Sequence, residues 1–179
     1  MRIRLHDLNF VPMIPEEEIK RRTSEMGNEL FNRLGDKNPL FIVILNGAFM
    51  FAADLVRAYS APCEMAFVTL SSYSGTSSTG MVTTTLGLNT NIAGRHIVIV
   101  EDIVDTGRTL HAFLQTLNNQ QPASVTLTAF LRKPEAQVFP IQVDLTGFDI
   151  ENKFVAGYGL DYDQLGRNLP GVWVLESQS

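Results

Sequence analysis

The sequence predicts an α/β protein with a central, mostly parallel sheet that is flanked by helices. Residues 40–45 and 97–100 are continuous apolar runs, which are typical of strands buried on both faces of a parallel sheet. Each run leads into a helical pattern, and the second pattern has apolar residues at Leu110, Phe113, Leu114 and Leu117. Strands that alternate with helices in this way indicate the α/β class.

The remaining elements are expected in order along the chain. Residues 1–14 alternate loosely and should form a strand or an arm on the core. Pro15 and the three acidic residues after it favour a helix start, and Gly35 marks the end of that helix. Further strands are predicted at 64–70, 82–88, 125–131 and 172–175, with a strand and turn within 139–150. No internal repeat or linker interrupts the chain, so residues 1–179 should form a single domain.

Composition and charge exclude several classes of protein. The 179 residues are 45% hydrophobic and 18% charged, which is typical of one globular domain with its own core. A net charge of -5 argues against a surface that coats nucleic acid, since such surfaces are basic. Cys63 is the single cysteine, which excludes an internal disulfide and favours a reducing compartment. No apolar run reaches membrane-spanning length and no signal peptide opens the chain, so we expect a cytoplasmic protein with no membrane partner.

The residues suited to chemistry are concentrated where the second apolar run ends. Glu101 and Asp102 follow that run directly, and Asp105 comes three residues later. In an open α/β sheet, ligands bind where the carboxyl end of a strand leads into a helix. The next turn contains Gly107 and supplies backbone N–H groups at a helix N-terminus, which together form a phosphate cradle. Side-chain donors in the same turn come from Thr106, Arg108 and Thr109.

The acid pair suits a different ligand group from the phosphate cradle beside it. Glu101 and Asp102 would repel a polyphosphate, but they fit vicinal sugar hydroxyls or a hydrated divalent cation. A phosphate cradle next to a diol-binding acid pair describes a site for a ribose 5-phosphate. The simpler interpretation is an ordinary strand–turn–helix with solvated acids at the strand end, but the combination of features favours a functional site.

Residues 97–110 resemble the phosphoribosyl-pyrophosphate-binding motif of type I phosphoribosyltransferases. Together with the segments described below, they make the chain similar to the hypoxanthine (hypoxanthine-guanine) phosphoribosyltransferase family over nearly its whole length. The resemblance implies the type I phosphoribosyltransferase fold, in which a small hood and a flexible lid hairpin accompany the central sheet. The hood would comprise the N-terminal arm and roughly residues 134–179, and the lid would comprise residues 71–81.

Residues 45–51 resemble the pyrophosphate-binding loop of this family, which carries a cis peptide bond just before the position of Asn46. The resemblance implies that Asn46 and Gly47 contact the pyrophosphate. Many members of the family carry a basic residue where this chain has Asn46, so that side-chain charge is missing here while the backbone contacts remain. Considered alone, an Asn-Gly pair between two apolar elements would indicate only a turn.

Residues 71–80 are small and polar throughout and separate two predicted strands. A polar loop of this length in a compact domain is usually either functional or disordered. It resembles the flexible lid of the family, whose Ser-Tyr pair, here Ser72 and Tyr73, closes over the reacting centre.

Two further segments resemble the parts of the family that bind the base. Lys133 lies in an Arg-Lys-Pro sequence and corresponds to the lysine that contacts the 6-oxo group of the purine. Residues 153–163 resemble the hood segment, in which Phe154 would stack on the purine and Val155 would bond it through the backbone. The resemblance also implies that Asp161 faces the metal and pyrophosphate and that Arg167 reaches the pyrophosphate.

The reaction implied by the resemblance belongs to purine salvage. The 5-phosphoribosyl group would move from phosphoribosyl pyrophosphate to hypoxanthine, and also to guanine, giving the nucleoside monophosphate and pyrophosphate. Asp105 would act as general base on the purine imidazole proton. Mg²⁺ would be the cofactor, held by Glu101, Asp102 and Asp161. The implied partners are these small molecules and further copies of the chain in a dimer or tetramer, with no nucleic acid.

Four alternatives compete with this interpretation. A P-loop nucleotidase is excluded, because the Gly-Arg-Thr turn lacks the preceding Gly and the Lys of that motif. An aspartyl-phosphate hydrolase needs two acids separated by one residue, whereas Asp102 and Asp105 are separated by two. A regulatory protein of the same fold that senses phosphoribosyl pyrophosphate stays open, although the acidic composition argues against an RNA-binding face. A sister enzyme for xanthine, adenine or a pyrimidine also stays open, although the Lys133 and Phe154 segments argue against it.

Overall fold

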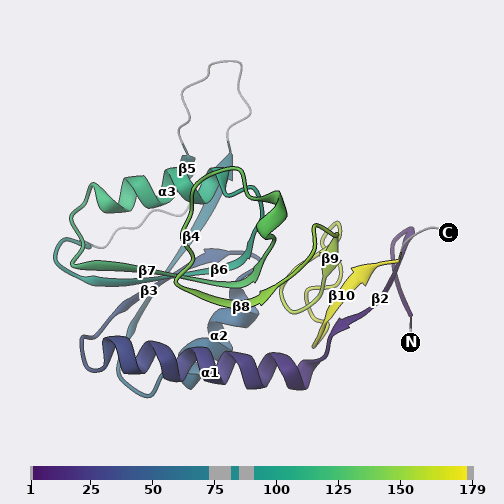
Figure 1. Cartoon of the computed structure of the whole chain (residues 1–179), viewed down its shortest axis with the longest axis horizontal. Helices are drawn as coiled ribbons and strands as arrows, with labels where there is room; N and C mark the ends of the chain where they lie inside the picture. The colour runs from purple at the N-terminus through teal and green to yellow at the C-terminus, as the bar shows by residue number, and fades with distance from the viewer. Residues whose placement is uncertain (1, 73–81, 85–90, 177–179) are drawn as a thin grey trace, which may run out of the picture.

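The computed structural model describes residues 2–72, 82–84 and 91–176 and has a large sheet at its centre (Figure 1). The strand order in this sheet is β5-β4-β3-β6-β7-β8, in which β5 pairs antiparallel with β4 and the other five strands are parallel. This arrangement confirms the predicted α/β class with a mostly parallel sheet. The strands are β3 (Leu40–Leu45), β4 (Glu64–Ser72), β5 (Val82–Thr84), β6 (His96–Val104), β7 (Ser124–Arg132) and β8 (Leu145–Asp149).

Helices cover both faces of the large sheet (Figure 1). Helices α1 (Glu16–Leu34) and α2 (Phe49–Ala58) lie on one side, and α3 (Arg108–Asn118) lies on the other. Alternate side chains of β3 enter the two cores: Phe41 packs in the cluster with α1 and α2, and Ile42 packs in the cluster with α3. A short 3-10 helix, η1 (Pro134–Ala136), follows β7. Among the described residues, no helix is both long enough and apolar enough to cross a membrane.

Strand β6 extends further than the sequence predicted. We expected a strand over 97–100 that ends at the acid pair, but the ladder to β7 continues through Glu101, Ile103 and Val104. The parallel pairing supplies backbone partners to these residues, so the two carboxylates lie inside the strand instead of after it. Because neighbouring residues of a strand point to opposite faces, Glu101 and Asp102 meet different surroundings.

The hood is a second, smaller sheet beside the large one (Figure 1). Its antiparallel strands are β1 (Ile3–Leu5), β2 (Leu8–Ile14), β10 (Val172–Leu175) and β9 (Val155–Ala156), in that spatial order. The predicted lower limit of roughly residue 134 needs correction, because β8 is the edge strand of the large sheet. Its parallel pairing with β7 assigns it to the core, so the C-terminal part of the hood begins after Asp149.

The predicted lid leaves the large sheet between β4 and β5. These strands pair antiparallel over three residues of each, which gives the base of a hairpin. Residues 73–81 of the predicted lid 71–81, including Tyr73, lie outside the described residues. Ser72 is the last residue of β4, and its side chain is not among those described.

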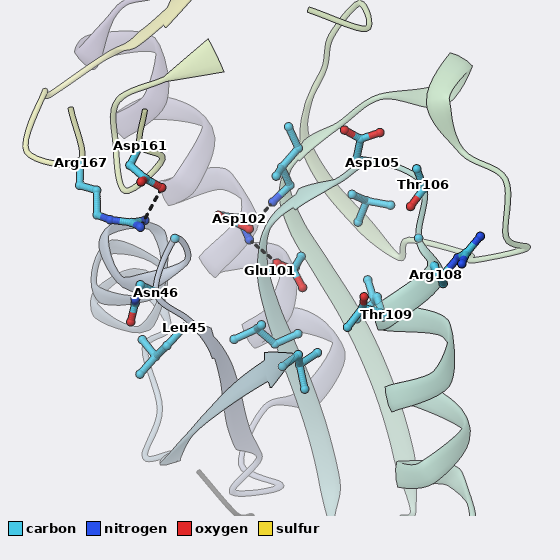
Figure 2. A pocket seen from close by; sticks show the side chains of 17 residues that line it. Leu45, Asn46, Glu101, Asp102, Asp105, Thr106, Arg108, Thr109, Asp161 and Arg167 are labelled. Atoms are coloured by element: carbon cyan, nitrogen blue, oxygen red, sulfur yellow. Dashed lines mark hydrogen bonds and ion pairs between the residues drawn. The ribbon is translucent and has the colours of Figure 1, made fainter. Parts of the chain in front are cut away.

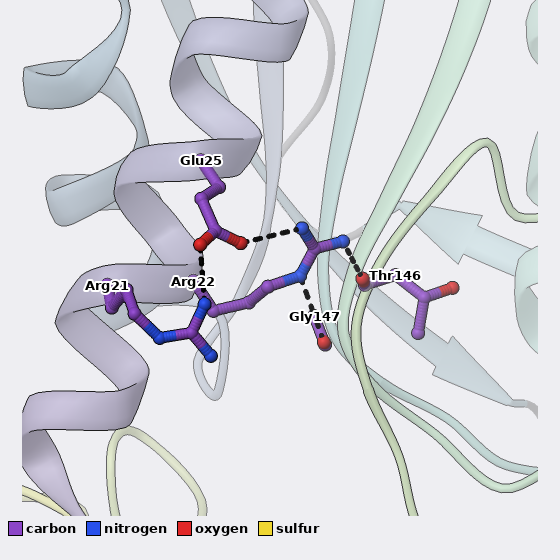
Figure 3. A network of polar contacts seen from close by, with 5 residues as sticks. All are labelled: Arg21, Arg22, Glu25, Thr146 and Gly147. Atoms are coloured by element: carbon purple, nitrogen blue, oxygen red, sulfur yellow. Dashed lines mark hydrogen bonds and ion pairs between the residues drawn. The ribbon is translucent and has the colours of Figure 1, made fainter.

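Arg22 fastens helix α1 to the edge strand β8 (Figure 3). Its guanidinium donates hydrogen bonds to the backbone oxygens of Thr146, at 2.6 Å, and Gly147, at 3.2 Å. Glu25 accepts hydrogen bonds from both Arg22 and the neighbouring Arg21. Edge strands present backbone groups that need partners, and Arg22 supplies two of them from a helix.

Candidate active site

The largest group of predicted site residues lines one cavity of about 400 Å³ (Figure 2). The cavity opens where β3 and β6 end and α3 begins, and the hood contributes its opposite wall. This is the edge of a parallel sheet at which ligands bind in α/β proteins. Eleven predicted residues are part of the lining: Asn46, Gly47, Glu101, Asp102, Asp105, Thr106, Gly107, Arg108, Thr109, Asp161 and Arg167.

The acid pair has one buried and one better solvated carboxyl group. Glu101 is buried, and this burial, with the neighbouring Asp102 as a second cause, raises its pKa well above the ordinary 4.5. A carboxylate oxygen of Glu101 accepts a hydrogen bond from the backbone N–H of Asp102 at 3.2 Å. Asp102 in turn accepts from the backbone N–H of Ile103 at 2.8 Å, which fixes its carboxylate at the cavity wall.

The loop after β3 is shaped around Asp102. The Leu45–Asn46 peptide bond is cis, as the resemblance implied, and Asn46 lies in the cavity wall below Arg167 (Figure 2). A Cβ atom on Gly47 would lie 1.6 Å from Oδ2 of Asp102, so only glycine allows this approach. The loop is therefore fitted to the acid pair at this point, and a side chain at position 47 would displace a carboxylate.

The phosphate turn is held by the segment that follows Lys133. Gly107 has φ +79 and caps the N-terminus of α3, and its open α-carbon packs on Ile141. The backbone oxygen of Thr106 accepts hydrogen bonds from Val138 and Phe139, both at 3.1 Å. With the turn fixed, the first N–H groups of α3 point toward the cavity and can bind an anion.

Two hood residues face this turn across the cavity. Arg167 and Asp161 form an ion pair of 2.7 Å, visible in Figure 2 opposite Asp102. Arg167 also donates to the backbone oxygen of Gly159 at 2.8 Å, and Asp161 accepts from the backbone N–H of Gln164 at 2.8 Å. These contacts hold one cation and one anion at the same wall.

The residues expected to bind the base lie outside that cavity lining. Lys133 is buried, and its ammonium group lies 3.2 Å from Oδ2 of Asp105, so the two predicted base contacts are already paired. Phe154 is 44% exposed and lines a second cavity of about 360 Å³ in the hood with Lys153 and other residues. Val155 is buried in β9. The structure thus separates a polar donor side from a hood side that carries the aromatic ring.

A metal ion would find oxygen ligands on two walls of the first cavity. Asp102 and Asp161 both line it, and Glu101 stands next to Asp102. Mg²⁺ is usually held by one or two carboxylates together with substrate phosphates, and these residues fit that requirement. Within the described part of the chain, no group of three or more His, Cys, Asp or Glu residues forms a metal-binding cluster by itself.

Sequence reasoning missed the contact between the hood and the pyrophosphate loop. Gly159 has φ +99, and a Cβ atom there would lie 2.1 Å from the backbone oxygen of Gly47. The signal in the sequence was the Gly-Tyr-Gly pattern at 157–159, in which glycines permit both a turn and a close approach. This contact closes the cavity on the hood side.

Comparison with known proteins agrees with this geometry. The model of the phosphoribosyl transferase domain family matches residues 15–163. The hypoxanthine-guanine phosphoribosyltransferase of Lactococcus lactis is 43% identical over 167 residues, which cover 93% of this chain and 91% of that protein. The chain belongs to the hypoxanthine-guanine phosphoribosyltransferase family. A second member, from Bacillus subtilis, is 40% identical over 172 residues, covering 96% of this chain and 95% of its own.

Solved structures place the whole fold in the same family. A hypoxanthine-guanine phosphoribosyltransferase from Bacillus anthracis, with HEPES in its active site, has a TM-score of 0.86 at 30% identity and covers 93% of this chain and 97% of its own. A mutant hypoxanthine phosphoribosyltransferase of Trypanosoma cruzi, solved as a ternary substrates complex, has a TM-score of 0.86 at 38% identity, with coverage of 92% and 94%. The type I phosphoribosyltransferase fold predicted from the sequence is thereby confirmed.

Proposed function

We propose that this phosphoribosyltransferase moves the 5-phosphoribosyl group from phosphoribosyl pyrophosphate to hypoxanthine and guanine. The observation that carries the proposal is the first cavity, in which a phosphate-binding turn at α3 and an acid pair on β6 share one wall. The names of the relatives from Lactococcus lactis and Bacillus subtilis support these two purines as acceptors.

The donor fits the cavity group by group. Its 5-phosphate would accept hydrogen bonds from the turn that begins α3 and contains Thr106 and Thr109. Its ribose hydroxyls would meet the carboxylates of Glu101 and Asp102, whose negative charge also favours the oxocarbenium-like transition state. The pyrophosphate would lie toward Gly47 and the hood wall.

The acceptor purine would be read by Asp105 and Lys133. The ammonium group can donate to a carbonyl oxygen at position 6, and the carboxylate can accept the imidazole proton. Their 3.2 Å ion pair keeps both side chains together before the base arrives. An amino group at position 6 would leave the buried ammonium unpaired, so adenine should be rejected.

We assign Mg²⁺ as the cofactor, with Asp161 and the acid pair as its protein ligands. When bound, Mg²⁺ would neutralise charge that develops on the leaving pyrophosphate. Arg167 would share that task from the hood wall once Asp161 turns to the metal. The lid, including Ser72 and Tyr73, remains a prediction that closure excludes water from the reacting centre.

Xanthine is the second candidate acceptor. A relative named hypoxanthine-guanine-xanthine phosphoribosyltransferase, from Tritrichomonas foetus, is 38% identical over 162 residues, covering 90% of this chain and 88% of its own. Xanthine also carries a 6-oxo group, so the contact proposed for Lys133 does not exclude it.

The setting of the enzyme follows from bulk properties and from its relatives. We propose a cytoplasmic enzyme that acts as a homo-oligomer and has no nucleic-acid partner. The net charge of -5 and the single cysteine support this setting.

Product analysis tests the proposed reaction. The protein is mixed with phosphoribosyl pyrophosphate, Mg²⁺ and hypoxanthine, and inosine monophosphate and pyrophosphate are separated by chromatography. We expect both products in equal amounts and none when EDTA removes the metal. Lys133→Gln should raise the KM for hypoxanthine more than the KM for the donor. Donor binding without any nucleotide product would instead favour the regulatory protein of the same fold.

A further inference from the structure

Tyr158 occupies an unusual place between the hood and the core. It lies in a turn of three consecutive positive φ values, +106 at Gly157, +48 at Tyr158 and +99 at Gly159. A positive φ is uncommon for a tyrosine, since its Cβ crowds the following carbonyl. Its side chain is nevertheless only 4% exposed, so it leaves the hood turn and enters the core.

The tyrosine hydroxyl reaches helix α2. It donates a hydrogen bond to Oδ2 of Asp54 at 2.7 Å, and its ring packs on Phe130 of β7 with centroids 4.7 Å apart. Burial, and secondarily the hydrogen bond to Asp54, raises the pKa of Tyr158 far above its ordinary value, so the hydroxyl stays protonated and remains a donor. A buried hydrogen bond to a charged group is one of the stronger single contacts in a protein.

This bond holds the turn at the point where the hood meets the cavity. Gly159, the next residue, lies against the backbone oxygen of Gly47. The oxygen of Gly159 accepts the hydrogen bond from Arg167, and Arg167 pairs with Asp161. The position of both charged groups at the cavity therefore depends on where this turn sits on α2 and on the loop before it.

We propose that Tyr158 and Asp54 are positioning residues for the pyrophosphate side of the donor site. They fasten the hood turn to α2, so that Arg167 and Asp161 face the cavity in the arrangement that meets a Mg²⁺-bound diphosphate. Neither residue lines the cavity, and both act through Gly159. This inference rests on the proposed function for the identity of the ligand.

The base side of the hood is held by other contacts. Val155 and Ala156 pair with Val174 and Trp173 of β10, and the backbone oxygen of Phe154 accepts from Leu175 at 2.9 Å. Loss of the Tyr158 hydroxyl leaves that ladder in place. The effect of such a loss should therefore fall on the donor and on pyrophosphate, with little change for the purine.

Two variants of the bond and three controls test the proposal. Tyr158→Phe removes the donor and Asp54→Ala removes the acceptor, whereas Asp54→Asn keeps an acceptor oxygen and should restore binding. Tyr59→Phe is matched to Tyr158→Phe, because Tyr59 is also 4% exposed and donates to a backbone oxygen, that of Gly35, at 2.6 Å. Arg57→Ala removes only the exposed ion pair of Asp54.

The readouts are the KM values of both substrates and the Kd of Mg²⁺-pyrophosphate from calorimetry, with melting temperature measured in parallel. We expect Tyr158→Phe and Asp54→Ala each to weaken donor and pyrophosphate binding by about tenfold, the scale of one hydrogen bond to a charged group. The double variant should be no worse than either single one, since one bond is lost once. Purine KM should stay within about twofold, and Tyr59→Phe should lower the melting temperature alone.

Two results would overturn the positioning role. One is a Tyr158→Phe protein that melts earlier but binds Mg²⁺-pyrophosphate as the wild type does. The other is an Asp54→Asn protein as impaired as Asp54→Ala. If the Tyr158 variant does not fold, the two Asp54 variants decide the matter, because Asp54 lies on the surface of α2. A failure of the proposed function is distinct, since the wild type itself would then bind no Mg²⁺-pyrophosphate or make no nucleotide.

Discussion

Single carboxyl groups decide what the cavity can do, and Asp105 has the most direct chemical role. We expect Asp105→Asn to lower kcat by about two to four orders of magnitude, the usual contribution of a general base. Donor KM should change little, because the phosphate turn and the acid pair are untouched. Steady-state kinetics with each substrate varied would measure both. An unchanged kcat with a lost donor affinity would reassign Asp105 to ribose or metal binding.

Glu101 carries a cost in stability that its site accepts. Its pKa is raised in the folded protein, so the folded state prefers the protonated form, and that preference is lost as pH rises above the ordinary 4.5 through the raised value. Glu101→Gln should therefore increase the melting temperature near neutral pH, with a gain that shrinks as pH falls toward 4.5. Functional sites commonly trade stability for such groups.

Glu64→Gln is the control for that measurement. The hydrogen bond and charge of Arg95 lower the pKa of Glu64, so its stabilising contribution is present at neutral pH and is lost on acidification. This variant should lower the melting temperature near neutral pH. A Glu101→Gln protein that behaves like Glu64→Gln would contradict the burial argument.

Residues in one continuous motif were predictable from sequence, and residues joined by the fold were not. Glu101 through Thr109 follow each other, so their approach to one ligand could be expected from a strand–turn–helix. The ion pair of Lys133 with Asp105 and the bond of Tyr158 with Asp54 join distant segments. Such pairs depend on which strands and loops become neighbours, which no local pattern encodes.

At the scale of elements, the loop between β3 and α2 must lie close to β6. We expect Gly47→Ala to raise donor KM by at least about tenfold, because the added Cβ would meet the Asp102 carboxylate at 1.6 Å. Gly94→Ala is the control, since Gly94 also has a positive φ but has open space around it. Both should lose some stability, and only Gly47→Ala should lose donor affinity. Equal kinetics of the two proteins would show that the close approach is not needed.

The packing of α1 on β8 offers a stability test away from the cavity. Arg22→Ala should lower the free energy of unfolding by about 1.5–3 kcal/mol, since it removes charged hydrogen bonds to two strand carbonyls. Arg21→Ala removes only an exposed pair with Glu25 and should change it by no more than about 0.5 kcal/mol. Urea unfolding of both proteins would measure the difference. Similar losses would mean that Arg22 does not secure the edge strand.

The length of β6 marks the limit of local pattern reading. The apolar run at 97–100 identified the strand, but its continuation through Glu101 and Asp102 depends on pairing with β7. Polar residues at a sheet edge keep strand geometry when a neighbouring strand supplies hydrogen bonds. The same reason explains why the hood limit was wrong, since 145–149 joins the core only through its partner strand β7.

For the whole molecule, layers and helix positions followed from hydrophobic periodicity, whereas the placement of the hood did not. Buried strands and amphipathic helices define a doubly covered sheet wherever they alternate. The hood joins the N-terminal strands β1 and β2 to β9 and β10 at the other end of the chain. Its seat over the cavity depends on glycine contacts such as that of Gly159 with Gly47.

The central claim is that the molecule is a phosphoribosyltransferase for 6-oxopurines. Its most direct test is the value of kcat/KM for hypoxanthine, guanine, xanthine and adenine, measured with saturating phosphoribosyl pyrophosphate and Mg²⁺. We expect hypoxanthine and guanine to be used well, and adenine to be used about three to four orders of magnitude less efficiently, because it would leave the buried Lys133 without a partner. Adenine used as well as hypoxanthine, or no nucleotide formed with any of the four bases, would contradict the claim.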